Sequence, residues 1–373
     1  MKDISTVDRN FKVDTKIDKE DIVFFNALDE PFEINGVYFG EGQFRRMPSE
    51  VANTLNKGIQ SLHTHTAGGR LRFKTNSPYV AIHTKIDAPL NKYPFFSISG
   101  KSGFDMYVKR DGKDVFYREF MIPEDYESGY ESVIDFDSEG EKEITINFPI
   151  YSDVYSLFIG LSKDADVKSP EPYTNKNVIV YYGSSITQGA CATRPGNTYE
   201  NFISRKFDCD YINLGFGGSA IAEKEIAEYI SSLENMTVFV YDYDHNAYSP
   251  EFLKETHENM FNIIRSAHPH IPIIILPRPR MYLLPTDVER HEVIKETYET
   301  ARNSGDEKVY FMPGCKLMEI AGNDGTIENT HPSDLVFFSM AEAISEVLEG
   351  IIKRINPQYK VVHKWQKLYA WVE

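Results

Sequence analysis

Two different spacings of hydrophobic residues divide the chain into two parts. The first part consists of short runs in which apolar and polar residues alternate, such as Tyr79–Ile86, and turn signals such as Lys109-Arg-Asp-Gly-Lys113 separate the runs. Alternation places every second side chain on one face of a strand, so this part predicts an antiparallel β sandwich of the jelly-roll type. In the second part, continuous apolar runs alternate with stretches of helical periodicity. This pattern predicts an α/β domain whose parallel sheet is covered by helices on both faces.

These patterns also predict the domain boundaries. We expect a β-sandwich domain over residues 1–165, a polar linker with two prolines over 166–176, and an α/β domain over 177–356. The strands of the α/β domain are expected at 178–182, 211–214, 237–241, 273–276 and 309–312, and an amphipathic helix over 339–355 is expected to close it. The aromatic tail, 357–373, is expected to pack on the β domain because it is too apolar to remain in water.

Charge and composition narrow the range of partners. The 373 residues include 40 basic and 56 acidic side chains, and the net charge of −16 repels nucleic acid phosphates and anionic membrane surfaces. No apolar run approaches the roughly 20 residues that cross a membrane, and residues 1–10 contain no apolar stretch of the kind expected in a secretion signal. We therefore expect a cytoplasmic protein, compatible with a homo-oligomer, that binds neither nucleic acid nor membranes. The cysteines Cys191, Cys209 and Cys315 are few and lack metal-type spacing, so we expect no structural disulfide and no metal site among them.

A pair of serines follows the first apolar run of the second part. In Gly183-Ser-Ser-Ile-Thr-Gln-Gly189 the glycines permit a tight turn where a buried strand emerges, and one serine hydroxyl is expected at the carboxyl edge of the sheet. The segment resembles the Gly-Asp-Ser-x-x-x-Gly block of the SGNH hydrolases, also called the GDSL esterase family. This resemblance implies that Ser185 is the nucleophile, that Ser184 replaces the usual Asp, and that the domain has a three-layer, flavodoxin-like fold.

Two later segments resemble the oxyanion blocks of the same family and occur in the same order. Asn213-Leu-Gly-Phe-Gly-Gly-Ser-Ala220 implies Gly218 as a backbone donor, and Tyr241-Asp-Tyr-Asp-His-Asn-Ala247 implies Asn246 as a side-chain donor. Together with the backbone N–H of Ser185, these two groups would bind the negative oxygen that forms during acyl transfer.

The last block lies just before the closing helix. Glu328-Asn-Thr-His331 resembles the Asp-x-x-His of the family, which implies that His331 is the base and that Glu328 is the carboxylate that orients it. Glutamate departs from the usual aspartate at this position. Asp324 is therefore the reserve carboxylate, and a Ser–His pair assisted by a backbone carbonyl is the third alternative.

Further residues near the predicted strand ends are candidate substrate contacts. Asp244 and His245 follow the third strand and Arg278 follows the fourth, while Trp365 in the tail offers an aromatic face for a sugar ring. For Asp244 and His245 a structural role is equally compatible with the sequence. Upstream, Gly103-Phe-Asp-Met-Tyr107 resembles the Gly-x-Asp-Leu-Tyr signature of a β domain that precedes some SGNH esterases. There the sequence favours a buried strand tyrosine over a catalytic one.

The resemblance implies a serine esterase that acts through an acyl-enzyme and needs no cofactor. The preceding β domain favours a carbohydrate O-acetylesterase, with an oligosaccharide, a polysaccharide or a small acetyl ester as substrate. One alternative is a general short-chain esterase or lysophospholipase. Another is a carbohydrate-binding protein with a disabled site, which the departures at Glu328 and Ala247 motivate.

Overall fold

The computed structural model describes residues 13–87, 94–123, 125–356 and 359. Their contacts form two units. The first contains the described residues up to Met47, His63–Pro172 and Ala192–Gly196, and the second contains Pro48–Leu62, Tyr173–Cys191 and the described residues from Asn197 onward. Residues 48–62 are thus flanked in sequence by the first unit but belong to the second. Residues 192–196 are flanked by the second unit but belong to the first. The predicted tail over 357–373 lies outside the described residues except for Tyr359.

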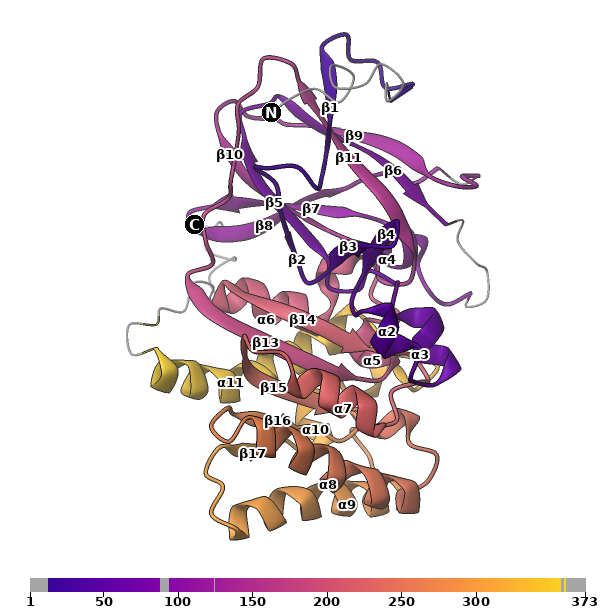
Figure 1. Cartoon of the computed structure of the whole chain (residues 1–373), viewed down its shortest axis with the longest axis vertical. Helices are drawn as coiled ribbons and strands as arrows, with labels where there is room; N and C mark the ends of the chain where they lie inside the picture. Colours follow the sequence, from indigo (N-terminus) through magenta and orange to yellow (C-terminus); the bar gives the residue numbers. More distant parts are fainter. Residues whose placement is uncertain (1–12, 88–93, 124, 357–358, 360–373) are drawn as a thin grey trace. The chain divides into compact units, whose positions relative to one another are not determined.

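The first unit is built from two antiparallel sheets (Figure 1). One sheet has the order β1 (Ile22–Asn26), β11 (Val154–Ser162), β6 (Tyr79–Ile86) and β9 (Tyr130–Asp135). The other has the order β12 (Val167–Lys168), β5 (Arg70–Thr75), β10 (Lys142–Asn147), β7 (Asp105–Arg110) and β8 (Lys113–Glu119), with β2 (Glu33–Asn35) also paired to β5. The smaller elements are β3 (Tyr38–Gly40), β4 (Gln43–Arg45) and α4 (Ile98–Ser102).

Alternating side chains of these strands fill one common core. On β10, Ile144 and Ile146 are fully buried while Thr145 between them is only partly covered. Val80 and Ile82 on β6 belong to the same hydrophobic cluster. Burying one such side chain stabilises a fold by about 1.5–3 kcal/mol, so the alternation read from the sequence specifies which face of each strand turns inward. The predicted N-terminal β sandwich is confirmed.

The second unit contains the predicted parallel sheet. Its order is β14 (Cys209–Gly215), β13 (Asn175–Gly183), β15 (Met236–Asp242), β16 (Ile273–Ile275) and β17 (Val309–Phe311). All neighbouring pairs are parallel. The chain places its second strand on one side of the first and the remaining strands on the other. Such a reversal of direction leaves a crevice at the carboxyl ends of the strands, where ligands bind in open α/β sheets.

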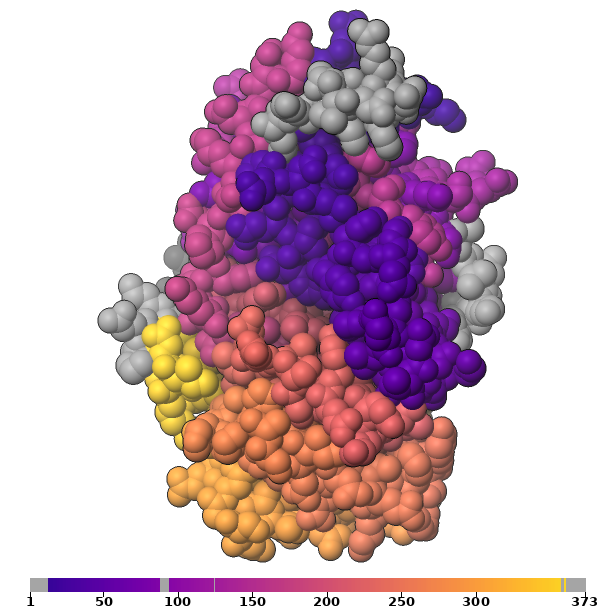
Figure 2. All heavy atoms as spheres, viewed as in Figure 1, coloured from indigo at the N-terminus to yellow at the C-terminus, as the bar shows by residue number. Residues whose placement is uncertain are grey.

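Helices connect and cover this sheet, as predicted. They are α2 (Ser49–Ala52), α3 (Lys57–Leu62), α5 (Ser185–Gln188), α6 (Tyr199–Phe207), α7 (Lys224–Ser231), α8 (Pro250–Ala267), α9 (Pro285–Asn303), α10 (Gly314–Leu317) and α11 (Asp334–Ile355). α6 packs with α11, whereas α7 packs with α8 and α8 with α9. The orange surface of this unit in Figure 2 belongs largely to α8 and α9. α8 begins where a sequence signal places it, since Ser249 caps the backbone N–H of Phe252 and Pro250 occupies the first turn.

A buried histidine joins α8 to α9 and gives the fold a testable response to acid. His257 is 2% exposed and its Nδ1 lies 2.8 Å from the hydroxyl of Thr297. Desolvation lowers the pKa of His257 to about 3. The unfolded chain takes up a proton near pH 6.5 and the folded chain does not, so protons favour unfolding by about 1.4 kcal/mol per pH unit below that value.

Comparison with His257→Gln isolates this contribution from that of the other ionisable groups. We expect the free energy of unfolding of the wild type, minus that of His257→Gln, to fall by about 1.4 kcal/mol for each pH unit between pH 6 and pH 4. Urea titrations at several pH values measure it. A difference that stays constant over this range would contradict a neutral buried imidazole.

Candidate active site

The serine hydroxyl that the sequence singled out lies at the carboxyl end of β13, the first strand of the parallel sheet in chain order. β13 ends at Gly183, and the chain turns at once into the four-residue helix α5, whose first residue is Ser185. The side chain of Ser184 accepts a hydrogen bond from the backbone N–H of Ile186 at 3.2 Å and so caps this helix. Ser184 is fully buried and Ser185 is only partly buried. The strand and the cap together present Ser185 at the edge of the sheet.

The imidazole of His331 reaches this hydroxyl. Nε2 of His331 lies 2.9 Å from Oγ of Ser185, although the two residues are 146 positions apart in sequence. On the other side of the ring, Nδ1 contacts the carboxylate of Glu328. A carboxylate can only accept a hydrogen bond, so Nδ1 carries the proton and Nε2 is left as the acceptor that faces the serine. The hydroxyl of Ser185 thus contacts a base, His331, and that base contacts an orienting carboxylate, Glu328.

The glycine-rich loop after β14 and the loop after β15 are joined by one carbonyl group. The carbonyl of Phe216 accepts hydrogen bonds from the backbone N–H groups of Ser219 at 2.9 Å and Ala220 at 3.1 Å, and from Nδ2 of Asn246 at 3.0 Å. Within this turn Gly218 has φ of +69°, a backbone conformation that favours glycine. The structure thus brings the two predicted oxyanion blocks together, and Nδ2 of Asn246 carries a second hydrogen beyond the one donated to Phe216.

Two residues that sequence reasoning missed hold the same loop. Oε1 of the buried Gln188, on α5, accepts a hydrogen bond from the backbone N–H of Gly217 at 2.8 Å. Nδ2 of Asn56 donates to the carbonyl of Ser219 at 2.8 Å, across 163 positions of sequence. Gln188 lies within the serine motif, where its polar side chain on a buried helix was a usable signal. Nothing in the sequence near Asn56 indicated this contact.

Comparison with known proteins identifies the family. A model of the GDSL-like lipase/acylhydrolase family matches residues 175–349, and a model of the N-terminus of SGNH-hydrolase-type esterases, named for its GxDLY motif, matches residues 22–167. A crystal structure of a protein from Bacteroides ovatus, described as a GDSL-like lipase, is 30% identical. The match covers 89% of this chain and 98% of that one, with a TM-score of 0.79. The chain belongs to the GDSL-like lipase/acylhydrolase family. The resemblance read from the sequence is confirmed, and the protein is a hydrolase of the esterase type.

Other solved structures share the fold of this GDSL-like hydrolase at lower identity. A salicylyl acyltransferase from a tetracycline biosynthetic pathway is 20% identical, covers 89% of this chain and 98% of its own, and has a TM-score of 0.71. An acetyl xylan esterase from Butyrivibrio proteoclasticus is 12% identical, covers 89% of this chain and 98% of its own, and has a TM-score of 0.57. The comparison with curated proteins gave no match.

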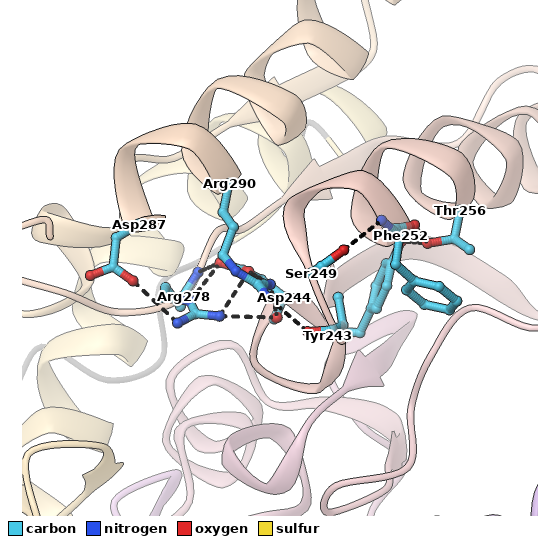
Figure 3. A network of polar contacts seen from close by, with 9 residues as sticks. Tyr243, Asp244, Ser249, Phe252, Thr256, Arg278, Asp287 and Arg290 are labelled. Atoms are coloured by element: carbon cyan, nitrogen blue, oxygen red, sulfur yellow. Dashed lines mark hydrogen bonds and ion pairs between the residues drawn. The ribbon is translucent and has the colours of Figure 1, made fainter. Parts of the chain in front are cut away.

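A buried ion-pair network fixes the loop of this hydrolase that carries Asn246 (Figure 3). Asp244 is 1% exposed, and its carboxylate accepts hydrogen bonds from Nε of Arg278 at 3.0 Å and from Nη1 of Arg290 at 3.0 Å. Nη1 of Arg278 also reaches Asp287 at 3.2 Å. Burial alone would raise the pKa of Asp244, but Arg278 outweighs it and the pKa is lowered. Removing one partner of such a buried pair costs about 3–5 kcal/mol.

Two of the candidate substrate contacts, Asp244 and Arg278, are members of this network. Asp244 and Arg278 contact each other, and these contacts give both side chains a structural part in the loop. His245 is partly buried, and desolvation, followed by the charge of Arg278, lowers its pKa to about 3, so the imidazole is neutral at pH 7. Trp365 lies outside the described residues. Substrate binding by any of the four remains a prediction.

Burial raises the pKa of two other ionisable groups near the serine and histidine. Burial, with the nearby charge of Glu328, raises the pKa of the Cys191 thiol to about 12, so that thiol does not compete as a nucleophile at neutral pH. Burial also raises the pKa of Asp242, whose Oδ2 accepts a hydrogen bond from Thr187 at 3.3 Å. Within the described residues there is no cluster of three metal-ligating side chains, and no helix there is long and apolar enough to cross a membrane.

Proposed function

We propose that this protein is a serine esterase that removes acetyl groups from oligosaccharides or polysaccharides through an acyl-enzyme. The observation that carries the proposal is the 2.9 Å approach of Ser185 Oγ to His331 Nε2, with Glu328 on the opposite ring nitrogen. A serine hydroxyl is a weak nucleophile by itself, and a base within hydrogen-bond reach is what activates it.

The reaction runs in two acyl transfers. Nε2 of His331 takes the proton of Ser185 as Oγ attacks the ester carbonyl, and the same nitrogen returns the proton to the departing sugar oxygen, leaving an acetyl group on Ser185. A water molecule then attacks the acetyl carbonyl and gives its proton to His331, and acetate leaves as Ser185 recovers its hydrogen. The carboxylate of Glu328 orients the imidazole and stabilises the imidazolium that forms in each step.

The oxyanion of each tetrahedral intermediate is assigned to three donors. These are the backbone N–H groups of Ser185 and Gly218 and the side-chain amide of Asn246. The contact of Asn246 with Phe216, and that of Gln188 with Gly217, support the proposal because they fix the donors before the substrate arrives. Donors that need no reorganisation are the effective ones.

Carbohydrate acetyl esters are proposed as the substrate class on two grounds. The architecture, a β sandwich before an α/β hydrolase domain, is shared with an acetyl xylan esterase. The net charge of −16 disfavours substrates with phosphate groups, which lysophospholipids carry.

The decisive experiment combines labelling with a panel of esters. A fluorophosphonate should modify Ser185, as read by mass spectrometry, and acetate should be released faster from acetylated xylo- or manno-oligosaccharides than from esters of longer acyl chains. Preference for long acyl chains would favour a lipase, and transfer of the acyl group to an added alcohol instead of water would favour an acyltransferase. A protein that the reagent leaves unmodified would be a binding protein, and the proposal would fail.

Asn246→Ala tests the oxyanion assignment. Loss of one such donor costs about 2.7–4 kcal/mol of activation free energy, so kcat for p-nitrophenyl acetate should fall by about 10²–10³-fold. KM should change little, because the charge on the oxygen develops only in the transition state. Wild-type turnover in a folded Asn246→Ala variant would remove this residue from the mechanism.

A further inference from the structure

The loop 192–196 follows the nucleophile helix in sequence but belongs to the first unit by its contacts. Cys191 before it and Asn197 after it belong to the second unit. The loop starts shortly after Ala190, whose backbone N–H donates to the carbonyl of Ser185 at 2.9 Å. The chain that leaves the nucleophile is thus anchored within a few residues.

A fully buried carboxylate of the sandwich supplies much of this anchor. Asp105 on β7 is 0% exposed, and its Oδ2 accepts hydrogen bonds from Nη1 of Arg194 at 2.8 Å and from the backbone N–H of Gly196 at 2.8 Å. Its Oδ1 accepts from Nδ2 of Asn147 on β10 at 2.6 Å. A buried charge is costly unless it is paired and hydrogen-bonded, and two of these three partners lie on the loop.

A buried tyrosine two residues further along β7 supplies the rest. Nη1 of Arg194 donates to the hydroxyl of Tyr107 at 2.6 Å, and that hydroxyl donates to the carbonyl of Gly196 at 3.3 Å. The guanidinium of Arg194 lies 3.7 Å from the ring centroid of Phe116. A Cβ at position 196 would come within 2.5 Å of Tyr107 and 2.8 Å of Asp105, so the backbone approaches so closely that only glycine fits.

We propose that Asp105 and Tyr107 are positioning residues for catalysis: by fixing Arg194 and Gly196 they hold the segment that carries Ser185 in its reactive geometry. The proposal rests on the proposed role of Ser185. It assigns the Gly-Phe-Asp-Met-Tyr107 motif to the nucleophile loop and not to the binding of carbohydrate. Both polar side chains of the motif make hydrogen bonds to the loop.

Tyr107→Phe tests the proposal because it keeps the ring and removes only the hydroxyl. The matched control is Tyr79→Phe, since Tyr79 is also 3% exposed and lies in the first unit, but its hydroxyl donates to Asp21 at 2.9 Å. We expect Tyr107→Phe to lower kcat for p-nitrophenyl acetate and the rate of fluorophosphonate labelling of Ser185 by about tenfold each. The reason is that the carbonyl of Gly196, a buried residue, and the guanidinium of Arg194 each lose a hydrogen-bond partner. The KM should stay within about twofold, and Tyr79→Phe should leave both rates unchanged.

A second variant acts on the same contact from the loop side. Gly196→Ala should slow labelling at least as much as Tyr107→Phe, because the added methyl group pushes the loop away from β7. Rates are normalised to folded protein by circular dichroism. Equal labelling rates in Tyr107→Phe, Gly196→Ala and Tyr79→Phe would overturn the proposal, as would a Tyr107→Phe variant that raised only the KM for acetylated xylo-oligosaccharides. Failure of the proposed function is distinguishable, because then the wild type itself would not be labelled.

Discussion

Ser185→Ala and His331→Ala are each expected to lower kcat/KM for p-nitrophenyl acetate by about 10⁵–10⁶-fold, and the double variant should be no worse than either alone. The two groups act as one unit, since the hydroxyl is activated only through the imidazole 2.9 Å away. Removing either one therefore removes the whole nucleophilic pathway. The rate that remains would come from the oxyanion donors and from binding.

The neighbouring serine provides the control for this prediction. Ser184→Ala removes a hydroxyl one position earlier, but that hydroxyl is buried and caps α5 through the N–H of Ile186. We expect a loss of about 1 kcal/mol in the free energy of unfolding and retention of fluorophosphonate labelling. If Ser184→Ala abolished labelling while Ser185→Ala kept it, Ser184 and not Ser185 would be the nucleophile. Steady-state kinetics of the four variants and mass spectrometry of the labelled peptides decide the question.

The general features of this fold could be read from the sequence because they follow from local spacing. Alternation on strands such as β10 specifies a sandwich face, and a continuous apolar run such as β13 specifies a strand buried on both sides. The meeting of the loops after β14 and β15, where Asn246 contacts the carbonyl of Phe216, was also predictable. Parallel strands end at one edge of a sheet, so motifs that follow successive strands meet there even when they are far apart in sequence.

The partners of the charged residues could not be predicted in the same way. Asp244 and Arg278 both follow strands at the catalytic edge, which made them candidate substrate contacts, but pairing with Arg290 on α9 depends on how α9 packs on α8. Neither a propensity nor a spacing encodes that packing. The grouping of residues 48–62 with the second unit and of 192–196 with the first has the same origin. Each rests on contacts between residues distant in sequence, such as Asn56 to Ser219 across 163 positions and Asp105 to Arg194 across 89.

The turn that presents the triad carboxylate could not be predicted from the sequence either. Glu328 and Asn329 have φ of +50° and +58°, and the backbone N–H of Thr330 donates to the carbonyl of Ile327 at 3.0 Å. These are the features of a type I′ turn, which joins the two-residue strands β18 (Thr326–Ile327) and β19 (His331–Pro332). A glutamate is uncommon in the left-handed region. The structure nevertheless places it against Nδ1 of His331, on the side of the ring that the predicted mechanism needs.

Glu328→Gln is expected to lower kcat by about 10²–10³-fold with little change in KM. Loss of a fully buried triad carboxylate lowers kcat by about 10⁴-fold, because the histidine loses its correct tautomer and the imidazolium loses its partner. The side chain of Glu328 is 45% exposed, and water screens part of its charge, so we expect a smaller loss. Glu328→Asp keeps the charge on a shorter side chain, so its kcat should lie between that of the wild type and that of Glu328→Gln. Steady-state kinetics with p-nitrophenyl acetate measure all three.

Asp324→Asn is the matched control, because Asp324 is the other carboxylate that the sequence offered for this role. It lies in the turn Gly322–Gly325, is exposed, and precedes the segment that contacts His331. Its substitution should leave kcat within about twofold of the wild type, since an exposed charge acts on distant groups only weakly. If Asp324→Asn lowered kcat more than Glu328→Gln does, Asp324 would be the carboxylate that orients His331. Equal, small effects of both substitutions would leave a backbone carbonyl as the partner of the imidazole, and the contact of Glu328 with Nδ1 would then have no part in the chemistry.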